Sequence, residues 1–472
     1  MVFSDPSFLF YFLPLALVLY WVGGWRRRNF YLLLISLVFY TSGGGGLVIL
    51  LIGSSLLTYF VALVLDRSGS ESRRKIAQTT GIALLLISLL SWKYLGFAVK
   101  QISALTDSFG FTFDVRINLV LPIAISFYTF QCISYLVDVG RRTIVAERSI
   151  VTFLCYILFF PHLLAGPIVR FSDVAEQLAS KSTQRWDAFV QSCPRFFWGL
   201  AKKVLVADQA AHIANAAFGV AGYQLGALDT VVGVVAYSVQ IYFDFSGYSD
   251  MAIGLAGMFG IKFQENFKRP YSSSSVTDFW RRWHISLSSW FRDYVYFPLG
   301  GNRNGTSKTY RNLLLIFVLT GFWHGANWTF MVWGLIHGAA LVLERLLLRN
   351  QKDFRIFSRF LLRIWTIAVV MFGWLLFRSV DLAHAGELLG ALGGNAGFGL
   401  SPLVREAITP QRAFWTMLGF CVFFLPPGRS FGERLIEIET TTARRLLAVA
   451  MGLLAAMYAL SSSFSPFLYF QF

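Results

Sequence analysis

Two histidines are the first candidates for chemistry, because charged and aromatic residues surround both of them in the sequence. His284 lies in the motif DFWRRWHISLSSWFRDY at residues 278–294, and His324 lies in GFWHGAN at residues 321–327. A neutral imidazole can accept a proton from a reacting group. Arginines such as Arg281 favour the neutral form of His284, since like charges disfavour the cation. We therefore predict that His284 and His324 are catalytic, and that Trp323 and Asn327 fix the orientation of His324.

The predicted place of His324 is deep inside a membrane. It lies in the apolar run 313–348, twelve residues beyond Asn312, which is roughly 18 Å along a helix. The hydrocarbon core is about 30 Å thick, and ionisable residues at such depth usually face a cavity or pathway. A hydrogen-bonded structural histidine is the alternative. We favour that structural interpretation for His337, whose neighbours Gly334 and Gly338 predict close helix packing.

Residues 277–297 predict one amphipathic helix that carries His284 at the border between its two faces. Thr277 or Asp278 is the expected N-cap, and Pro298 is expected to end the helix. We expect this helix at the cytosolic edge of the membrane, and the alternative is that it only anchors the protein at the surface. Its apolar face contains Trp280, Trp283, Leu287, Trp290, Phe291 and Tyr294, and its polar face contains Arg281, Ser288 and Arg292.

The composition predicts an all-α polytopic integral membrane protein. Of 472 residues, 56% are hydrophobic and only 14% are charged, which does not suit a soluble protein of this size. The apolar runs predict about eleven membrane segments, some of them re-entrant or interfacial, in a single membrane-embedded domain over residues 1–472. The net charge of +16 lies mainly in short loops, which follows the positive-inside rule and requires no nucleic acid. The same rule places both termini outside.

Polar residues and helix breakers inside the apolar runs mark special positions. Asp244 and Asp250 lie in the run 231–261, where a carboxylate is costly unless it is paired or faces a cavity. Pairing across helices is the structural alternative to a functional role. Four glycines at residues 43–46 and Pro161 predict helix breaks. The four cysteines have no metal-type spacing, so no metal site is predicted.

The motifs at residues 278–287 and 321–325 resemble those of the membrane-bound O-acyltransferase (MBOAT) family. Supporting stretches are AGPI at residues 165–168, YFDFSGYSDM at 242–251 and RDY at 292–294, and the aromatic tail at 466–472 looks like that of the bacterial alginate O-acetyltransferase branch. The resemblance implies a helical fold around a central tunnel, a catalytic His324 and a second functional histidine, His284. His162 stands where the resemblance leads us to expect Gln, and its role stays open. The residues predicted to bind substrate are Trp323, Asn327, Arg281 and Asp244.

The resemblance also implies an activity. The expected enzyme takes an acetyl group from a cytosolic donor, acetyl-CoA or an acyl carrier, without a tightly bound cofactor. It delivers the group to a hydroxyl at the periplasmic face, for O-acetylation of an exopolysaccharide of the alginate or cellulose type. We expect a place in the bacterial inner membrane and a periplasmic esterase-like partner protein. The alternatives are D-alanyl transfer for teichoic acid by the same fold, and a non-enzymatic membrane transporter. In the enzymatic scheme His324 is either the base or the acylated group.

Overall fold

The computed structural model describes residues 1–24, 27–111, 115, 119–164, 166–179, 185–348, 356–395, 397–437 and 440–461. Each regular secondary-structure element within these ranges is a helix, which confirms the all-α fold. The predicted interfacial tail at residues 466–472 lies outside the described ranges. The chain forms two compact units, and we describe each by itself. The first contains mainly Ser7–Val190 and Leu255–Gln264, and the second mainly Gln191–Gly254 and Glu265–Phe472.

Several helices have the length and apolar composition that a membrane crossing requires. Among the described residues there are six such segments, and they confirm the prediction of a polytopic membrane protein. The count of about eleven stays a prediction, because re-entrant and interfacial segments are not long enough to be recognised in this way. The six segments are Arg28–Arg67, Glu71–Ser108, Ala227–Met258, Trp328–Leu347, Phe360–Arg378 and Thr442–Ser461.

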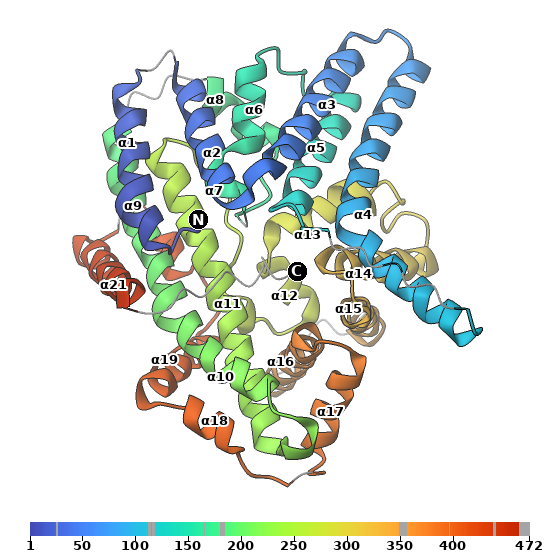
Figure 1. The fold of residues 1–472 in the computed structure, drawn as a ribbon, viewed down its shortest axis with the longest axis vertical. Helices are drawn as coiled ribbons and strands as arrows, with labels where there is room; N and C mark the ends of the chain where they lie inside the picture. Colours follow the sequence, from blue (N-terminus) through green and yellow to red (C-terminus); the bar gives the residue numbers. More distant parts are fainter. Residues whose placement is uncertain are drawn as a thin grey trace. The chain divides into compact units, whose positions relative to one another are not determined.

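The first unit is built around a group of neighbouring helices. In Figure 1 the helices α3, α4 and α5 lie side by side, and all three pairs are in contact. The four glycines at residues 43–46 interrupt the helix as predicted, since α2 ends at Gly44 and Gly45 has a φ of +54°. A second break separates α6 from α7, where Pro161 occupies the first turn of α7. The helices are α1 (Leu13–Val22), α2 (Arg28–Gly44), α3 (Val48–Arg67), α4 (Glu71–Ser108), α5 (Ile125–Gly140), α6 (Ile150–Leu158), α7 (Phe160–Leu163) and α8 (Phe171–Ala179).

The second unit contains both candidate histidines. Its first helix, α9 (Arg185–Ala201), begins in the first unit and continues through a π-helical turn, η4 (Lys202–Ala207), into α10. The long helix α11 has its last turn in the first unit. The remaining elements are α10 (Asp208–Phe218), α11 (Ala227–Met258), α12 (Val276–Arg282), α13 (Ile285–Phe291), η7 (Arg292–Tyr296), α14 (Thr306–His324), α15 (Trp328–Leu348), α16 (Ile356–Arg378), α17 (Leu382–Leu392), α18 (Pro402–Ala407), α19 (Pro410–Cys421), α20 (Phe431–Leu435) and α21 (Thr442–Ser461).

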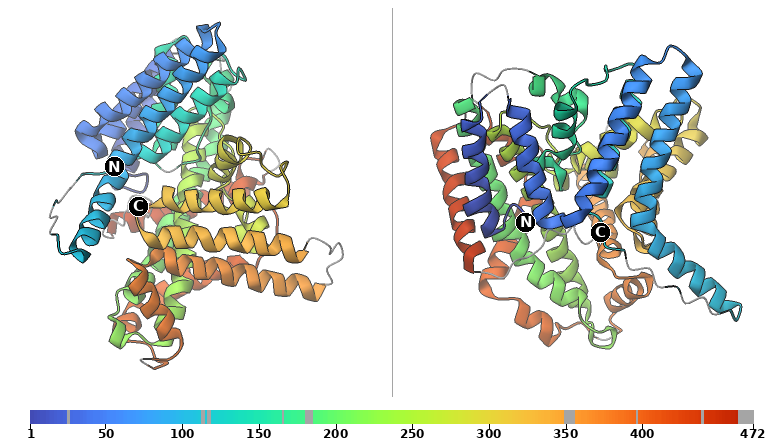
Figure 2. Two further views of the ribbon diagram at one scale, coloured as in Figure 1. Left: turned by 90° about the vertical axis from the view of Figure 1, so that its right-hand side faces the viewer. Right: turned by 45° about the horizontal axis from the view of Figure 1, so that its top comes forward.

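Helices α14, α15 and α16 run next to one another, as the left view of Figure 2 shows. Small residues allow the first two to approach closely. A Cβ atom placed on Gly334 would lie only 2.2 Å from the carbonyl oxygen of Phe317, and one on Gly338 would lie 3.2 Å from the Cα of Leu314. Such contacts between backbones are typical of membrane helices with small residues at their interface. The close packing predicted around His337 is therefore confirmed.

The two carboxylates of α11 are paired with cations on the neighbouring helical segment. Asp244 lies 2.7 Å from the Nζ of Lys203, and Asp250 lies 2.8 Å from the Nζ of Lys202 and 2.7 Å from the guanidinium of Arg195. Pairing across helices, the structural alternative for both carboxylates, is confirmed. Because removing one partner would leave a buried charge uncompensated, these pairs hold α11 against the helical segment from α9 to η4.

Candidate active site

The single helix predicted for residues 277–297 is wrong, because the chain breaks at His284. Helix α12 ends at Arg282, and His284 adopts the left-handed conformation, with φ +44° and ψ +56°. A neighbouring segment causes the break by taking the backbone hydrogen bonds: Lys268 N donates to Arg282 O, and Ile285 N donates to Asn266 O. A non-glycine residue in this conformation is uncommon and persists only where its surroundings hold it, often at functional sites.

The start of α12 also differs from the prediction. The N-cap is Ser275, whose hydroxyl accepts a hydrogen bond of 2.9 Å from the backbone N–H of Asp278. Thr277 and Asp278, the two predicted caps, lie inside the helix. A cap requires extended backbone before the first turn. Ser275 has that backbone, with φ −156° and ψ 153°. Sequence alone did not distinguish among three neighbouring residues that can all act as caps.

His284 is buried, with only 1% of its surface exposed, so it does not lie on the surface of the protein. Its Nδ1 lies 3.3 Å from the Oδ1 of Asn266, and the edge of its ring packs against Phe245 at 4.7 Å between centroids. Burial lowers the pKa of His284 to about 3. The imidazole is therefore neutral at physiological pH, as predicted, but the cause is loss of hydration and not repulsion by arginines.

Asn266 determines which nitrogen of His284 carries the proton. The Oδ1 of Asn266 accepts hydrogen bonds from the backbone N–H of Ser286 at 3.2 Å and from its hydroxyl at 2.9 Å. The Nδ2 of Asn266 donates to the hydroxyl of Ser249 at 3.2 Å. Since a backbone N–H can only donate, the atom that receives it is the amide oxygen. The Nδ1 of His284 is then the donor to that oxygen, and Nε2 carries the lone pair that can accept a proton.

Asn266 was missed by the sequence analysis. It lies in a stretch without periodicity or any recognisable motif, eighteen residues before His284. Its side chain is fully buried in the fold, with 0% of the residue exposed. A buried asparagine that satisfies several partners holds them in one arrangement. Only the tertiary contact between the two segments reveals this role.

His324 is the last residue of α14 and sits in an aromatic enclosure. Only 4% of its surface is exposed, and its ring lies edge-on to Trp323, Trp333 and Phe377, at 4.9, 5.2 and 5.1 Å between centroids. These rings come from α14, α15 and α16, so the three adjacent helices together position the histidine. Helix α14 ends here because Gly325 adopts an extended backbone.

The structure brings the two histidines to the same tryptophan. The ring of His284 lies 6.3 Å from that of Trp323, which in turn lies 4.9 Å from that of His324. Trp323 therefore contacts both histidines, and its part in orienting His324 stays a prediction. Asn327 is engaged elsewhere: its Nδ2 donates to Val380 O at 2.6 Å, and its Oδ1 accepts from Thr329 N at 3.2 Å. These bonds belong to the start of α15, and aromatic packing surrounds His324.

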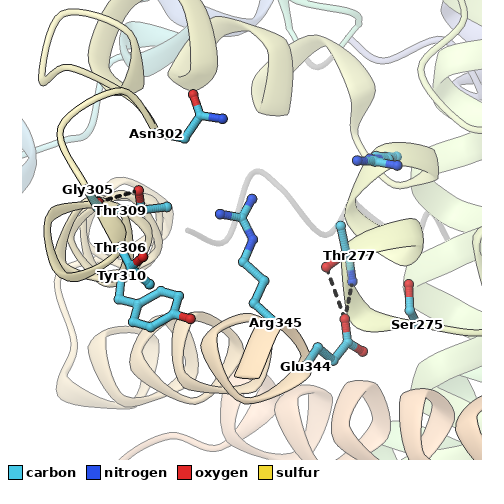
Figure 3. A pocket seen from close by; sticks show the side chains of 10 residues that line it. Ser275, Thr277, Asn302, Gly305, Thr306, Thr309, Tyr310, Glu344 and Arg345 are labelled. Atoms are coloured by element: carbon cyan, nitrogen blue, oxygen red, sulfur yellow. Dashed lines mark hydrogen bonds between the residues drawn. The ribbon is translucent and has the colours of Figure 1, made fainter. Parts of the chain in front are cut away.

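Two adjoining cavities open beside Arg281. One of about 400 Å³ lies between α12, α13 and α14, with Trp280, Leu287 and Phe317 among the residues of its wall. The other, of about 600 Å³, is more polar and is drawn in Figure 3. The two share Thr277, Arg281 and Arg345 in their walls. Arg281 is thus placed to meet a ligand, whereas Asp244 is held in its ion pair with Lys203.

The remaining histidines singled out in the sequence occupy packed interiors. His337 accepts a hydrogen bond of 3.4 Å at Nδ1 from the indole N–H of Trp280, which fits the structural interpretation. His162, in the first unit, is buried between Phe159 and Phe263, at 5.8 and 5.4 Å between ring centroids. These contacts assign His162 to the packing of the first unit.

Comparison with known proteins identifies the family of the chain. The family model of the membrane-bound O-acyltransferases matches residues 78–380. A probable alginate O-acetylase of Pseudomonas putida is 40% identical over 100% of both chains. A peptidoglycan O-acetyltransferase of Helicobacter pylori is 34% identical over 89% of this chain and 87% of its own. A teichoic acid D-alanyltransferase of Bacillus subtilis is 29% identical over 57% of this chain and 71% of its own.

The chain therefore belongs to the membrane-bound O-acyltransferase family. It is a multi-pass membrane protein, and it is an O-acyltransferase. The alternative of a non-enzymatic transporter is not supported, because the family is defined by acyl transfer. Both histidine motifs that suggested the resemblance lie within the matched residues 78–380.

Proposed function

We propose that this protein transfers an acetyl group from a cytosolic thioester to a hydroxyl of an exopolysaccharide of the alginate type. The proposal rests on one observation. In a membrane-bound O-acyltransferase, His284 and His324 both pack against the ring of Trp323. The similarity over the full length to an alginate O-acetylase supports acetyl as the group and a polysaccharide as the acceptor. The peptidoglycan O-acetyltransferase is also a polysaccharide-modifying relative by its name.

The reaction requires a base and a dry environment. The hydroxyl oxygen of the acceptor attacks the thioester carbonyl, so that a C–O bond forms while the C–S bond breaks. The imidazole of His324 takes the hydroxyl proton and passes it to the departing sulfur, which leaves as a thiol. Its aromatic enclosure keeps water away from the thioester and so limits hydrolysis. His284, neutral and held by Asn266, also packs against Trp323 and positions the donor.

The donor, the partner and the orientation belong to the same proposal. Acetyl-CoA or an acetylated carrier supplies the thioester from the cytosol, and a periplasmic esterase-like protein receives the acetyl group for final transfer. The protein lies in the bacterial inner membrane with both termini in the periplasm. The excess of Lys and Arg in the short loops supports this orientation.

The test uses membranes that contain the full chain, a periplasmic extract that supplies the partner protein, acetyl-CoA labelled in its acetyl group, and extracted polysaccharide. We expect label in ester linkage to the polysaccharide, and no label with the His324→Ala variant. D-alanyl transfer, supported by a relative of lower identity and coverage, predicts label only from a D-alanyl carrier. Label from that carrier alone would refute acetyl transfer, and the absence of label from either donor would refute the proposed function.

A further inference from the structure

A cluster of buried charges lies next to Asn266, the residue that holds His284. Arg195 of α9 has only 1% of its side chain exposed, and its guanidinium bridges two carboxylates. Its Nε and Nη2 donate to the Oδ1 of Asp250 at 3.0 and 2.7 Å. Its Nη1 and Nη2 donate to the two carboxylate oxygens of Glu265, the second at 2.6 Å. Because a guanidinium is planar and rigid, these four hydrogen bonds fix both carboxylates in distance and in angle.

Each of the two carboxylates is next in the chain to a residue that determines where Asn266 lies. Glu265 directly precedes Asn266. Asp250 directly follows Ser249, whose hydroxyl accepts a hydrogen bond of 3.2 Å from the Nδ2 of Asn266. Arg195 therefore joins the Asn266 segment to α11 at the place where the Asn266 side chain makes its own contact with α11. The ionic contact and the amide contact together fix the spacing between the segment and the helix.

The same segment holds the backbone on both sides of His284. Ile285 N donates to Asn266 O at 3.0 Å, and Lys268 N donates to Arg282 O at 2.9 Å. The Oδ1 of Asn266 lies 3.3 Å from the Nδ1 of His284. A shift of the segment would therefore displace the acceptor from the imidazole and disturb the left-handed backbone of the histidine. Since the members of a hydrogen-bonded network hold one another in one arrangement, a constraint at the buried guanidinium reaches the histidine through Asn266.

We infer that Arg195 is a positioning residue for His284 in the acyl-transfer reaction, although it takes no part in the bond changes. The inference rests on the proposed function and deepens it, because it assigns the contact that sets the place of one of the two histidines. Lys202 completes the cluster, with its Nζ 2.8 Å from the Oδ2 of Asp250, so that two cations face two carboxylates. What Arg195 supplies beyond its charge is the geometry of its planar fork, which a lysine lacks.

The experiment is a double-mutant cycle of Arg195→Lys and Asn266→Leu, with the full chain in membranes and the acetyl-transfer assay. Arg195→Lys keeps the positive charge, so neither carboxylate is left uncompensated, and it removes only the fork. The measured quantities are kcat/KM and the KM for acetyl-CoA, with rates normalised to the amount of protein. Such a cycle reports whether two residues act through one another, because independent effects multiply.

We expect Arg195→Lys to lower kcat/KM by about tenfold, which lies within the range of couplings between residues of one network. Its KM for acetyl-CoA should rise, because His284 positions the donor in the proposed reaction. A variant that only reduces the folded fraction lowers the rate at every donor concentration and leaves KM unchanged. In the Asn266→Leu chain, Arg195→Lys should change kcat/KM by less than about twofold, since the contact that passes the constraint to the imidazole is already lost.

Lys203→Arg is the matched control, because it alters the geometry of a second buried ion-pair cluster on the same helical segment and keeps the charge. Lys203 has 4% of its side chain exposed and pairs with Asp208 and Asp244 at 2.8 and 2.7 Å. Neither carboxylate is a neighbour of Asn266 or Ser249 in the chain. We expect this control to keep the KM of the wild type. A rise in its KM as large as that of Arg195→Lys would make the effect one of general packing and overturn the inference.

A second variant covers the case in which Arg195→Lys does not accumulate in the membrane. Glu265→Gln enters the same cycle, since 23% of the Glu265 side chain is exposed and glutamine still accepts a hydrogen bond from Arg195. We expect a loss of a few-fold in kcat/KM that is absent in the Asn266→Leu chain.

Two results overturn the positioning role while the wild type is active. One is a wild-type kcat/KM and KM for Arg195→Lys, and the other is a full tenfold loss that persists in the Asn266→Leu chain. Either result refutes the role of Arg195 alone. The absence of transfer by the wild type refutes the proposed function, and the inference with it.

Discussion

Replacement of Asn266 tests whether the orientation of His284 matters to the reaction. The Oδ1 of Asn266 accepts from three donors, Ser286 N, Ser286 Oγ and His284 Nδ1, at 3.2, 2.9 and 3.3 Å. Asn266→Leu keeps the branched shape of the side chain and removes that acceptor. A buried donor left without a partner costs about 1–3 kcal/mol. At about 1.4 kcal/mol per factor of ten, acetyl transfer should fall roughly 10- to 100-fold.

A second substitution distinguishes positioning from simple packing. Asn266→Asp keeps an oxygen that accepts from His284 but adds a negative charge, and a neighbouring carboxylate raises the pKa of a histidine by about 1–3 units. From its value of about 3, the pKa of His284 then rises towards the range of the assay. His284 becomes protonated as the pH falls through that raised pKa, so transfer by this variant should decline at the acid end while the wild type does not.

The assay is the initial rate of labelled acetyl transfer in membranes as a function of pH, normalised to the amount of protein. Ser286→Ala serves as the control, because it keeps the backbone N–H that bonds to Asn266 and loses only the hydroxyl. We expect this control to stay within a few-fold of the wild type. A wild-type rate for Asn266→Leu, or an unchanged pH profile for Asn266→Asp, would refute the positioning role of Asn266.

Four further predictions follow from the sequence and the structure. His324→Ala should lower acetylation by about 10²–10⁴-fold while the amount of protein in the membrane is unchanged, and more than about a tenth of the wild-type rate would exclude it as the central base. His284→Ala should impair binding of a non-hydrolysable acetyl-CoA analogue, whereas His324→Ala should bind it normally; full activity of His284→Gln would remove this histidine from the functional set. Cysteines at Ser307 and Gly394 should be labelled from opposite sides of the membrane, Ser307 from the cytosol, and labelling of both from outside would overturn the assignment of the two faces. Gly334→Ala should lower thermal stability, because its Cβ would lie 2.2 Å from a backbone oxygen of α14, and an unchanged melting temperature would contradict the close packing.

The class of the protein could be predicted from sequence because it depends on local composition. A chain with 56% hydrophobic residues and long apolar runs has few ways to satisfy its backbone in lipid other than helices. The need of Asp244 and Asp250 for partners followed from the same energetics, and the structure supplies those partners in Lys203 and Lys202. The break at the four glycines likewise came from residue types alone.

The geometry of the site depends on tertiary contacts, which the sequence did not predict. Helical periodicity continued through His284, but backbone hydrogen bonds with residues 266–268 ended the helix there, and His284 is buried in the interior. The partner that holds it, Asn266, belongs to a stretch without any motif, and the meeting with His324 occurs through Trp323. The periodicity of apolar residues predicts which residues share one face of a helix. It does not predict contacts between separate segments of the chain. For that reason the sequence could predict which residues are candidates for the chemistry, whereas only the tertiary structure determined how those residues contact one another.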